Sequence, residues 1–217
     1  MDDPALPEKV YSEVLGDLAQ VNRVTLAYRP TLNFIERAIG KRQSFTLLDV
    51  GFGQGDMLRR IADWGYRRGL DMKLVGIDLN PNSADVARNA TGQNQSIEYR
   101  VGDYAALAGQ NWDIVISSLV AHHMSAEQLV AFVRFMETEA RMGWFVNDLH
   151  RHVFAYYGFP ILAHLLGWHE IVKHDGRVSV ARSYRPDEWH GILSEAGVRG
   201  AGIRRRFPCR LCVERLK

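Results

Sequence analysis

Short apolar runs alternate with amphipathic helical segments through the middle of this 217-residue chain. The apolar runs lie at 45–50, 73–77, 96–101, 112–117 and 143–147. Between them, apolar side chains repeat at the three- and four-residue spacing of helices, at 56–64, 82–89 and 125–140. Strands separated by helices in this way form a parallel sheet with right-handed crossovers. The sequence therefore predicts an α/β protein with helices on both faces of the sheet.

The segments on either side of this alternation have a different pattern. Residues 8–40 read as helices, and Pro30 suits the first turn of the second one. Near the C-terminus, a helix over 185–197 ends at a glycine, and two strands follow at 201–206 and 209–215. We expect these last two strands to run antiparallel to each other.

Composition excludes several classes of protein. Lys and Arg total 27 against 25 Asp and Glu, a formal charge of +2, whereas nucleic-acid binders carry a strong basic excess. Two cysteines are too few for a disulfide scaffold, and Cys209 and Cys212 lack the second pair that a zinc site needs. No apolar run is long enough to span a membrane, and the first residues are acidic. We expect a cytoplasmic protein with semi-buried thiols, no metal and no stable membrane insertion.

A glycine loop follows the first predicted strand. Gly51, Gly53 and Gly55 lie in the stretch LLDVGFGQGD, which leads from an apolar strand into a helix. Glycines allow the tight turn, and the free N–H groups of the next helix favour an anionic group. The dinucleotide fingerprint G-x-G-x-x-G would need a glycine where Asp56 stands. A carboxylate at Asp49 repels a pyrophosphate but suits an ammonium group, which speaks against the alternative of an NAD(P)-dependent oxidoreductase.

Two further carboxylates follow the second and third strands. Asp78 ends the second strand, 78 − 55 = 23 residues after the last loop glycine, near the spacing at which a carboxylate binds a ribose diol. Asp103 follows the third strand and could accept a hydrogen bond from an adenine amino group. Each acid alone could simply cap a turn, so the argument depends on all three together.

With these segments in hand, the chain resembles the class I S-adenosylmethionine-dependent methyltransferases. The resemblance covers residues 45 to 150, and more weakly the C-terminus, through LLDVGFGQGD, VGIDLNPNS, GDY, WDIVISSLVAHHM and RSYRPDEWHGILSEAGV. It implies a three-layer Rossmann-like sheet of about seven strands, mostly parallel with the last one antiparallel. It also implies S-adenosylmethionine as donor and S-adenosylhomocysteine as product.

The resemblance implies where each part of the donor binds. Gly51, Gly53 and Gly55 would line its methionine part and ribose, with Asp49 at the loop or the amino group. Arg29, in the N-terminal helices, is a candidate for its carboxylate, and a solvated arginine is the alternative.

The remaining donor contacts are implied to follow the second, third and fourth strands. Asp78 would bind the ribose hydroxyls with Leu79 beside the adenine, and Asp103 and Tyr104 would hold the adenine. The residues implied to lie beneath the methionine part are Ser117, Ser118 and Leu119.

Four histidines follow the fourth and fifth strands and are candidates for a general base. A phenol has a pKa near 10 and a histidine one near 6.5, so an imidazole is a suitable proton acceptor. His150 and His152 open the aromatic segment after the fifth strand and are favoured over His122 and His123. Asp148 could orient one of them. For each histidine, a capping or buried hydrogen-bonded ring is the structural alternative.

Residues 149–183 interrupt the strand–helix rhythm with an apolar, aromatic segment. Apolar residues on several helical faces must be covered or line a pocket. We predict a helical lid over an apolar acceptor, with a substrate pocket formed by Tyr156, Tyr157, Phe159 and Trp168. Ordinary core packing and contact with a membrane surface are the alternatives.

These observations predict a methyltransferase that acts on a hydroxyl of an apolar small molecule such as a phenol, quinol or polyketide-like compound. C-methylation of a similar aromatic and a donor-binding protein without transferase activity remain alternatives. Methyltransferases that act on the amine of adenine or glutamine resemble one another in an [ND]-P-P-[FYW] motif after the fourth strand. Here that position reads Ser117-Ser-Leu-Val120, so we do not expect that substrate class. We expect a single domain over 1–217, divided into an N-terminal cap (1–44), a cofactor-binding core (45–148), a lid (149–183) and a C-terminal helix and strand pair (184–217).

Overall fold

A single seven-stranded sheet forms the centre of the computed structural model, which describes residues 27–165 and 170–217. The helices expected before residue 27, and Trp168, lie outside these residues. The strand order is β3-β2-β1-β4-β5-β7-β6, and only β7 runs against the others. The strands are β1 (Ser44–Val50), β2 (Asp71–Asp78), β3 (Ile97–Val101), β4 (Ile114–Ser118), β5 (Gly143–Leu149), β6 (Gly202–Arg206) and β7 (Arg210–Leu216). The predicted three-layer Rossmann-like fold is confirmed.

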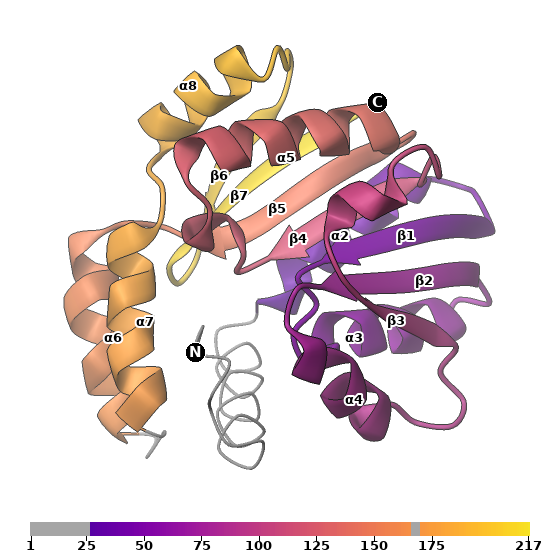
Figure 1. Cartoon of the computed structure of the whole chain (residues 1–217), viewed down its shortest axis with the longest axis horizontal. Coiled ribbons are helices and arrows are strands. Elements are labelled where there is room, and N and C mark those ends of the chain that lie inside the picture. Colours follow the sequence, from indigo (N-terminus) through magenta and orange to yellow (C-terminus); the bar gives the residue numbers. More distant parts are fainter. Residues whose placement is uncertain (1–26, 166–169) are drawn as a thin grey trace.

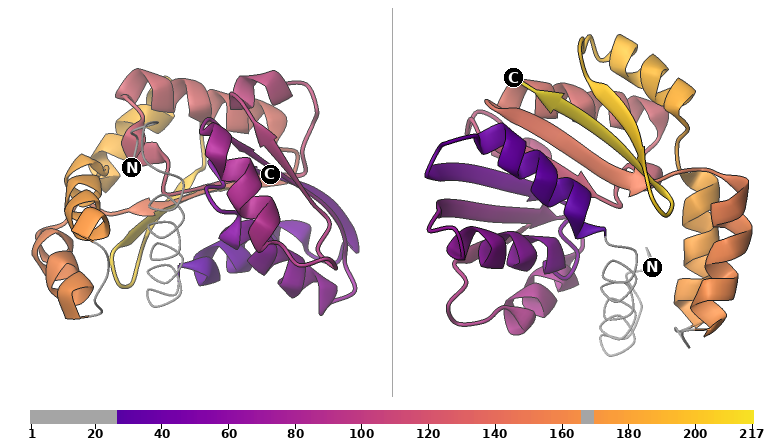
Figure 2. Two further views of the ribbon diagram at one scale, coloured as in Figure 1. Left: turned by 60° about the horizontal axis from the view of Figure 1, so that its bottom comes forward. Right: turned by 180° about the vertical axis from the view of Figure 1, so that it is seen from behind.

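Helices cover both faces of the sheet and bury one apolar cluster on each side (Figures 1 and 2). One face carries α2 (Tyr28–Ile39), α3 (Asp56–Tyr66) and α4 (Pro81–Ala90). The other carries the short helix η1 (Tyr104–Leu107), α5 (Ala126–Glu139) and α8 (Pro186–Glu195). Because both faces are covered, the central strands β1, β4 and β5 are buried along most of their length rather than at alternating positions.

Local sequence explains where these helices begin. The side chain of Asn80 accepts a hydrogen bond from the Asn82 amide, and Pro81 occupies the first position of α4. Ser125 and Gln128 form a reciprocal capping box at the start of α5. Such caps satisfy amides that would otherwise lack a partner at a helix N-terminus.

Two strands extend beyond their predicted ends because neighbouring strands pair with them. β2 begins at Asp71 rather than 73, since Asp71 pairs with Ser44 of β1. β5 continues to Leu149 rather than 147, since Leu149 pairs with Arg210 of β7. The extra length places Asp148 inside the sheet, which matters for the site described below.

Residues between β5 and α8 form two helices, α6 (Val153–Leu165) and α7 (Glu170–Arg182). They pack against each other beyond the carboxyl end of β5, as Figure 1 shows. α7 also packs against η2 (Ala121–His123), the short helix that follows β4. Within the described ranges, no helix is long and apolar enough to cross a membrane.

Candidate functional site

The carboxyl ends of β1, β2 and β4 meet at one edge of the sheet, on either side of the point where the strand order reverses. Open α/β sheets bind their ligands at this position. The loop Gly51–Gly55 lies here, and its three glycines have positive φ values of 77°, 57° and 75°. A Cβ on Gly51 would come within 2.2 Å of Val120 Cγ2, and one on Gly55 within 2.6 Å of the Tyr99 hydroxyl. Side chains at these two positions would therefore disrupt the loop.

Asp78 connects the glycine loop to the end of β2. Its Oδ2 accepts a hydrogen bond from the Gly53 amide at 2.8 Å, and its Oδ1 accepts one from the Asn80 amide at 2.9 Å. The carboxylate is half-buried, and each oxygen has a second lone pair. It can therefore hold the loop and still accept hydrogen bonds from a diol.

Asp49 is a buried carboxyl group below the glycine loop. Its residue is 1% exposed, and its Oδ1 has no hydrogen-bond partner among the described residues. Burial raises the pKa of Asp49 well above its ordinary value, and the nearby carboxylates of Asp56 and Asp78 raise it further. Buried polar atoms normally have partners, so an unpaired oxygen beneath a ligand-binding loop fits a ligand that carries an ammonium group. The residues present therefore fit the group that the sequence implied.

The end of β4 lies next to the glycine loop. The Ser117 hydroxyl donates to the Val50 carbonyl at 2.9 Å, which joins β4 to the end of β1. The Ser118 hydroxyl is buried without a partner in the part of the chain that the structure describes. Leu119 has a φ of 61°, a conformation that costs a non-glycine residue about 1–3 kcal/mol, and its amide donates to the Asn147 carbonyl at 3.1 Å.

The other residues implied to bind the donor are more exposed. Leu79 is 74% exposed directly after Asp78, and Arg29 is exposed in the first turn of α2. Asp103 caps η1 by accepting from the Ala105 amide at 2.8 Å. The ring of Tyr104 packs on two phenylalanine rings of α5. Asp103 thus has the capping role that the sequence left open as an alternative, with its second oxygen directed to no described partner.

A buried histidine–carboxylate pair joins the end of β4 to the end of β5. His122 Nδ1 lies 2.7 Å from Asp148 Oδ1, and the His122 amide donates to Asp148 Oδ2 at 2.9 Å. Both side chains are 4% exposed. Burial opposes ionisation of Asp148, but His122 and two backbone amides outweigh it and hold the pKa of Asp148 below its ordinary value. The carboxylate therefore stays ionised and fixes the ring of His122.

The favoured histidines lie elsewhere along the same edge. His150 is buried after β5, where its amide donates to the Cys209 carbonyl, and burial and nearby positive charges lower its pKa. His152 is exposed and its ring stacks on Phe154. His123 is exposed beside His122, with ring centres 4.2 Å apart. His122 has a buried carboxylate 2.7 Å from its ring nitrogen, so the geometry favours a residue that the sequence ranked lower.

The aromatic residues expected to line a pocket in the insert have different roles. The guanidinium of Arg177 lies 4.5 Å from the ring centre of Tyr156, which places Tyr156 against α7. Phe159 fills the space above Gly176 of α7, where an added Cβ would come within 2.0 Å of its ring. Tyr157 is 64% exposed. Tyr156 and Phe159 therefore help to pack α6 on α7, as the core-packing alternative expected.

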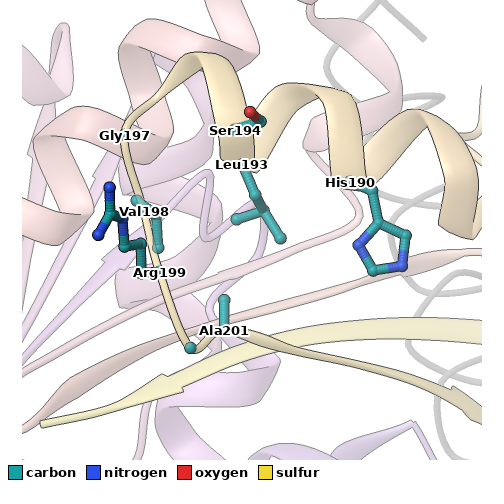
Figure 3. A pocket seen from close by; sticks show the side chains of 8 residues that line it. His190, Leu193, Ser194, Gly197, Val198, Arg199 and Ala201 are labelled. Carbon is teal, nitrogen blue, oxygen red and sulfur yellow. The ribbon is translucent and has the colours of Figure 1, made fainter.

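One hollow on the described surface is not part of this site. It measures about 410 Å³ and lies where α8 ends and β6 begins, at the opposite edge of the sheet (Figure 3). Its lining includes His190, Ser194 and Arg199. No strand that carries the glycine loop or the histidine–carboxylate pair ends there, so it has no part in the chemistry of the loop.

The two cysteines of the C-x-x-C pair lie around the start of β7. Cys209 precedes β7 rather than lying in it, contrary to expectation, because the pairing with β5 begins at Arg210. Both thiols are free, and burial raises the pKa of Cys212 to about 12. Among the described residues, no group of His, Cys, Asp and Glu side chains could hold a metal ion.

Comparison with known proteins agrees with this geometry. Residues 47–141 match the family described as a methyltransferase domain. The matched residues run from β1 to just past α5 and have the sequence pattern of a methyltransferase domain. This stretch contains the glycine loop, Asp78, Asp103 and the histidines after β4, so the resemblance seen in the sequence is confirmed. No curated protein matches the sequence.

Several solved methyltransferase structures share the fold of this chain at low sequence identity. Plantazolicin methyltransferase BpumL, solved with S-adenosylhomocysteine, is 14% identical with a TM-score of 0.70, over 98% of this chain and 91% of its own. A SAM-dependent methyltransferase from Aquifex aeolicus is 18% identical with a TM-score of 0.67, over 96% and 97%. Magnesium protoporphyrin IX methyltransferase from Synechocystis PCC 6803 is 15% identical with a TM-score of 0.61, over 94% and 85%.

Proposed function

We propose that this methyltransferase transfers a methyl group from S-adenosylmethionine to a hydroxyl of an apolar small molecule, a phenol, quinol or polyketide-like compound. The observation that carries the acceptor assignment is the buried His122–Asp148 pair beside the glycine loop. A phenolic hydroxyl must lose its proton during transfer, whereas a thiolate or carboxylate acceptor needs no base at neutral pH.

The donor supplies an electrophilic methyl group on a sulfonium centre. The chain's own residues bind and orient it. The glycine loop lets the ligand approach the backbone, Asp78 offers its free lone pairs to the ribose, and the unpaired oxygen of Asp49 suits the ammonium. Binding the donor with these fixed groups places it for an in-line transfer, which is most of what such a reaction requires of a protein.

His122 acts as the general base in this proposal. Ionised Asp148 accepts a hydrogen bond from Nδ1–H, which leaves the lone pair on Nε2 free to receive a proton. No described residue contributes a hydrogen bond to Nε2. When the acceptor hydroxyl gives its proton to Nε2, the carboxylate of Asp148 stabilises the imidazolium that forms.

The insert of α6 and α7 shields this reaction centre. α7 packs on η2, the helix that carries His122, and the Tyr184 hydroxyl donates to the Met124 carbonyl at 2.8 Å. These contacts hold the insert against the helix that carries the proposed base. Exclusion of water from the base favours transfer to a bound hydroxyl over side reactions.

The proposal assigns the acceptor to a class, hydroxyl-bearing apolar compounds. The similar structures are named for magnesium protoporphyrin IX and plantazolicin, which differ widely in chemistry. C-methylation ortho to a phenol would use the same base, and product analysis by mass spectrometry and NMR separates the two outcomes.

Donor binding is tested by calorimetry with S-adenosylmethionine, S-adenosylhomocysteine and NADH. We expect both sulfur ligands to bind and NADH not to. Asp78→Ala should weaken the sulfur ligands by about 1–3 kcal/mol, the cost of losing charged hydrogen bonds. Arg67→Gln, an exposed charge change at the end of α3, is the matched control and should bind as wild type does. Failure of both sulfur ligands to bind would contradict the proposed function.

The base is tested by replacing His122 with Gln and following methyl transfer to a panel of phenols. We expect kcat to fall about 100-fold or more with donor affinity unchanged, because general-base catalysis contributes at least that much. His190→Gln, an exposed histidine on α8, is the control and should keep full activity. A loss caused by His150→Gln or His152→Gln with His122→Gln active would move the base to the residues that the sequence favoured.

A further inference from the structure

A second hollow lies at the base of the insert, where the chain leaves the sheet for α6 and returns from α7 to α8. It measures about 250 Å³. The outgoing connection contributes His150, Arg151, His152 and Val153, the returning one contributes Arg185, Pro186 and Asp187, and β6 contributes Arg205. The hollow therefore joins both ends of the insert to the sheet.

Positive charge dominates this hollow. Three arginines and two histidines line it, against the single carboxylate of Asp187. Arg151 already forms an ion pair with Glu188. Glu188 Oε2 accepts a hydrogen bond from the Arg185 amide at 2.7 Å, but in the described ranges neither the Arg185 nor the Arg205 guanidinium forms an ion pair. These two arginines therefore line the hollow without a carboxylate paired to either guanidinium.

The pKa of His150 also reflects the positive charges that gather around this hollow. Burial lowers the pKa of His150, and Arg205, His152 and Arg185 lower it further, in that order. These groups come from three separate segments of the chain: β6, the start of α6 and the start of α8. Like charges brought together by the fold in this way destabilise one another unless a counter-ion binds.

We infer that this hollow is an anion-binding site for a phosphate- or carboxylate-type group. Arg185 and Arg205 would donate to its oxygens, and His150 and His152 would add hydrogen-bond donors on the third side. Planar guanidinium groups match the geometry of such oxyanions. A volume of about 250 Å³ accommodates a group of this size.

The position of the site relates it to the methyl transfer. His150 lies two residues after Asp148, which orients the proposed base. Two residues of extended chain span about 7 Å, so an acidic substituent on the acceptor could reach the hollow while its hydroxyl is at His122. A free anion at the same place would instead tie both connections of the insert to β6. The shared chemistry is an oxyanion, and the two sources are separated by experiment.

Phosphate binding is tested by NMR titration of the histidine ring signals, with the His150 signal identified by its loss in His150→Gln. Inorganic phosphate at constant ionic strength should raise the pKa of His150 by about 0.5–1 unit, because an opposite charge favours the protonated ring. The groups that face this ring are His152, Arg151, Arg185, Asp187 and Arg205, with the Cys209 thiol beside it.

Arginine variants give the matched comparison. Arg205→Gln should weaken phosphate binding about 5-fold and, without phosphate, should itself raise the pKa of His150. Arg67→Gln removes the same charge from the end of α3 and should change neither. The inference is overturned if phosphate leaves the His150 titration unchanged, or if the two variants bind phosphate alike.

Steady-state kinetics separates the sources of the anion, and this arm alone rests on the proposed function. If the acceptor supplies the group, phosphate should raise KM for a phenol that bears a carboxylate and leave its methyl ester unaffected. If a separate anion binds, phosphate should change kcat for both acceptors equally. Phosphate binding without any methyl transfer would leave the anion site intact and overturn only the proposed function.

Discussion

Backbone conformation at single residues shapes the donor side of the site. Gly51 and Leu119 follow neighbouring strands β1 and β4, and both have positive φ. Between them, the side chain of Val120 lies directly over Gly51, in space that any Cβ would take. The loop therefore depends on one glycine for two separate reasons, its φ and its lack of a side chain.

This dependence predicts unequal costs for alanine at two glycines of the same loop. Gly51→Ala should lower the free energy of unfolding by about 2–4 kcal/mol, because strain adds to a collision with Val120. Gly53→Ala, with a φ of 57° and nothing within 4 Å of the added Cβ, should cost only about 1 kcal/mol. Urea denaturation measures both. Gly69→Ala, beyond the far end of α3 with a φ of 67° and nothing within 4 Å of the added Cβ, is the control and should cost about as much as Gly53→Ala.

Among the elements, the insert is distinguished by how its two helices meet. α6 and α7 pack through the ring of Phe159 against Gly176, while Gly158 on α6 faces open space. Phe154 and Tyr157 remain 81% and 64% exposed on the outer side of α6. One glycine of this helical pair is thus required by packing and the other is not.

Alanine at these two glycines should have opposite effects. Gly176→Ala should destabilise the insert by about 1–2 kcal/mol, because Phe159 must leave its place, and should raise acceptor KM with donor affinity unchanged. Gly158→Ala should stabilise α6 by about 0.5–1 kcal/mol, since alanine favours a helix more than glycine does. Limited proteolysis of residues 150–183 reports both effects. Equal cleavage rates in the two variants would contradict this account of the packing.

At the scale of the whole molecule, folding disfavours the ionised form of one buried carboxyl group in the site, and a bound ammonium group would favour that form. Asp49 is buried with its pKa well above the ordinary value, first through burial and then through Asp56 and Asp78. In contrast, His122 holds the pKa of buried Asp148 down. The native state therefore disfavours the ionised form of Asp49 and favours the ionised form of Asp148.

Asp49→Asn should stabilise the ligand-free protein and weaken its binding of S-adenosylmethionine. A carboxyl group whose pKa is raised in the native state contributes full stability below its unfolded pKa of about 3.9 and loses it as pH rises toward the native pKa. The variant should therefore match wild type near pH 3.9 and exceed it by about 0.5–2 kcal/mol at neutral pH. Thermal unfolding across pH, with and without S-adenosylmethionine, measures this. A variant less stable than wild type at neutral pH without ligand would refute it.

Much of the architecture follows from the sequence alone, because periodicity and capping are local. The apolar runs determine which segments form strands, and Asn80-Pro81 and Ser125 with Gln128 determine where α4 and α5 begin. The positions of the glycine loop and Asp78 could likewise be predicted, since a strand that ends in such a turn places its next residues at the sheet edge. The residues whose position can be predicted are therefore those that depend on their neighbours in the sequence.

Only the tertiary structure decided which side chains meet. Asp148 contacts His122, 26 residues away, because β4 and β5 are adjacent and β7 extends β5 by two residues beyond its predicted end. Strand order likewise brings Arg205 of β6 to His150. The sequence by itself determined the elements and the glycine loop, through spacing along the chain. The proposed base, its carboxylate and the basic hollow depend on strand pairing, since contacts between distant segments leave no local periodic pattern.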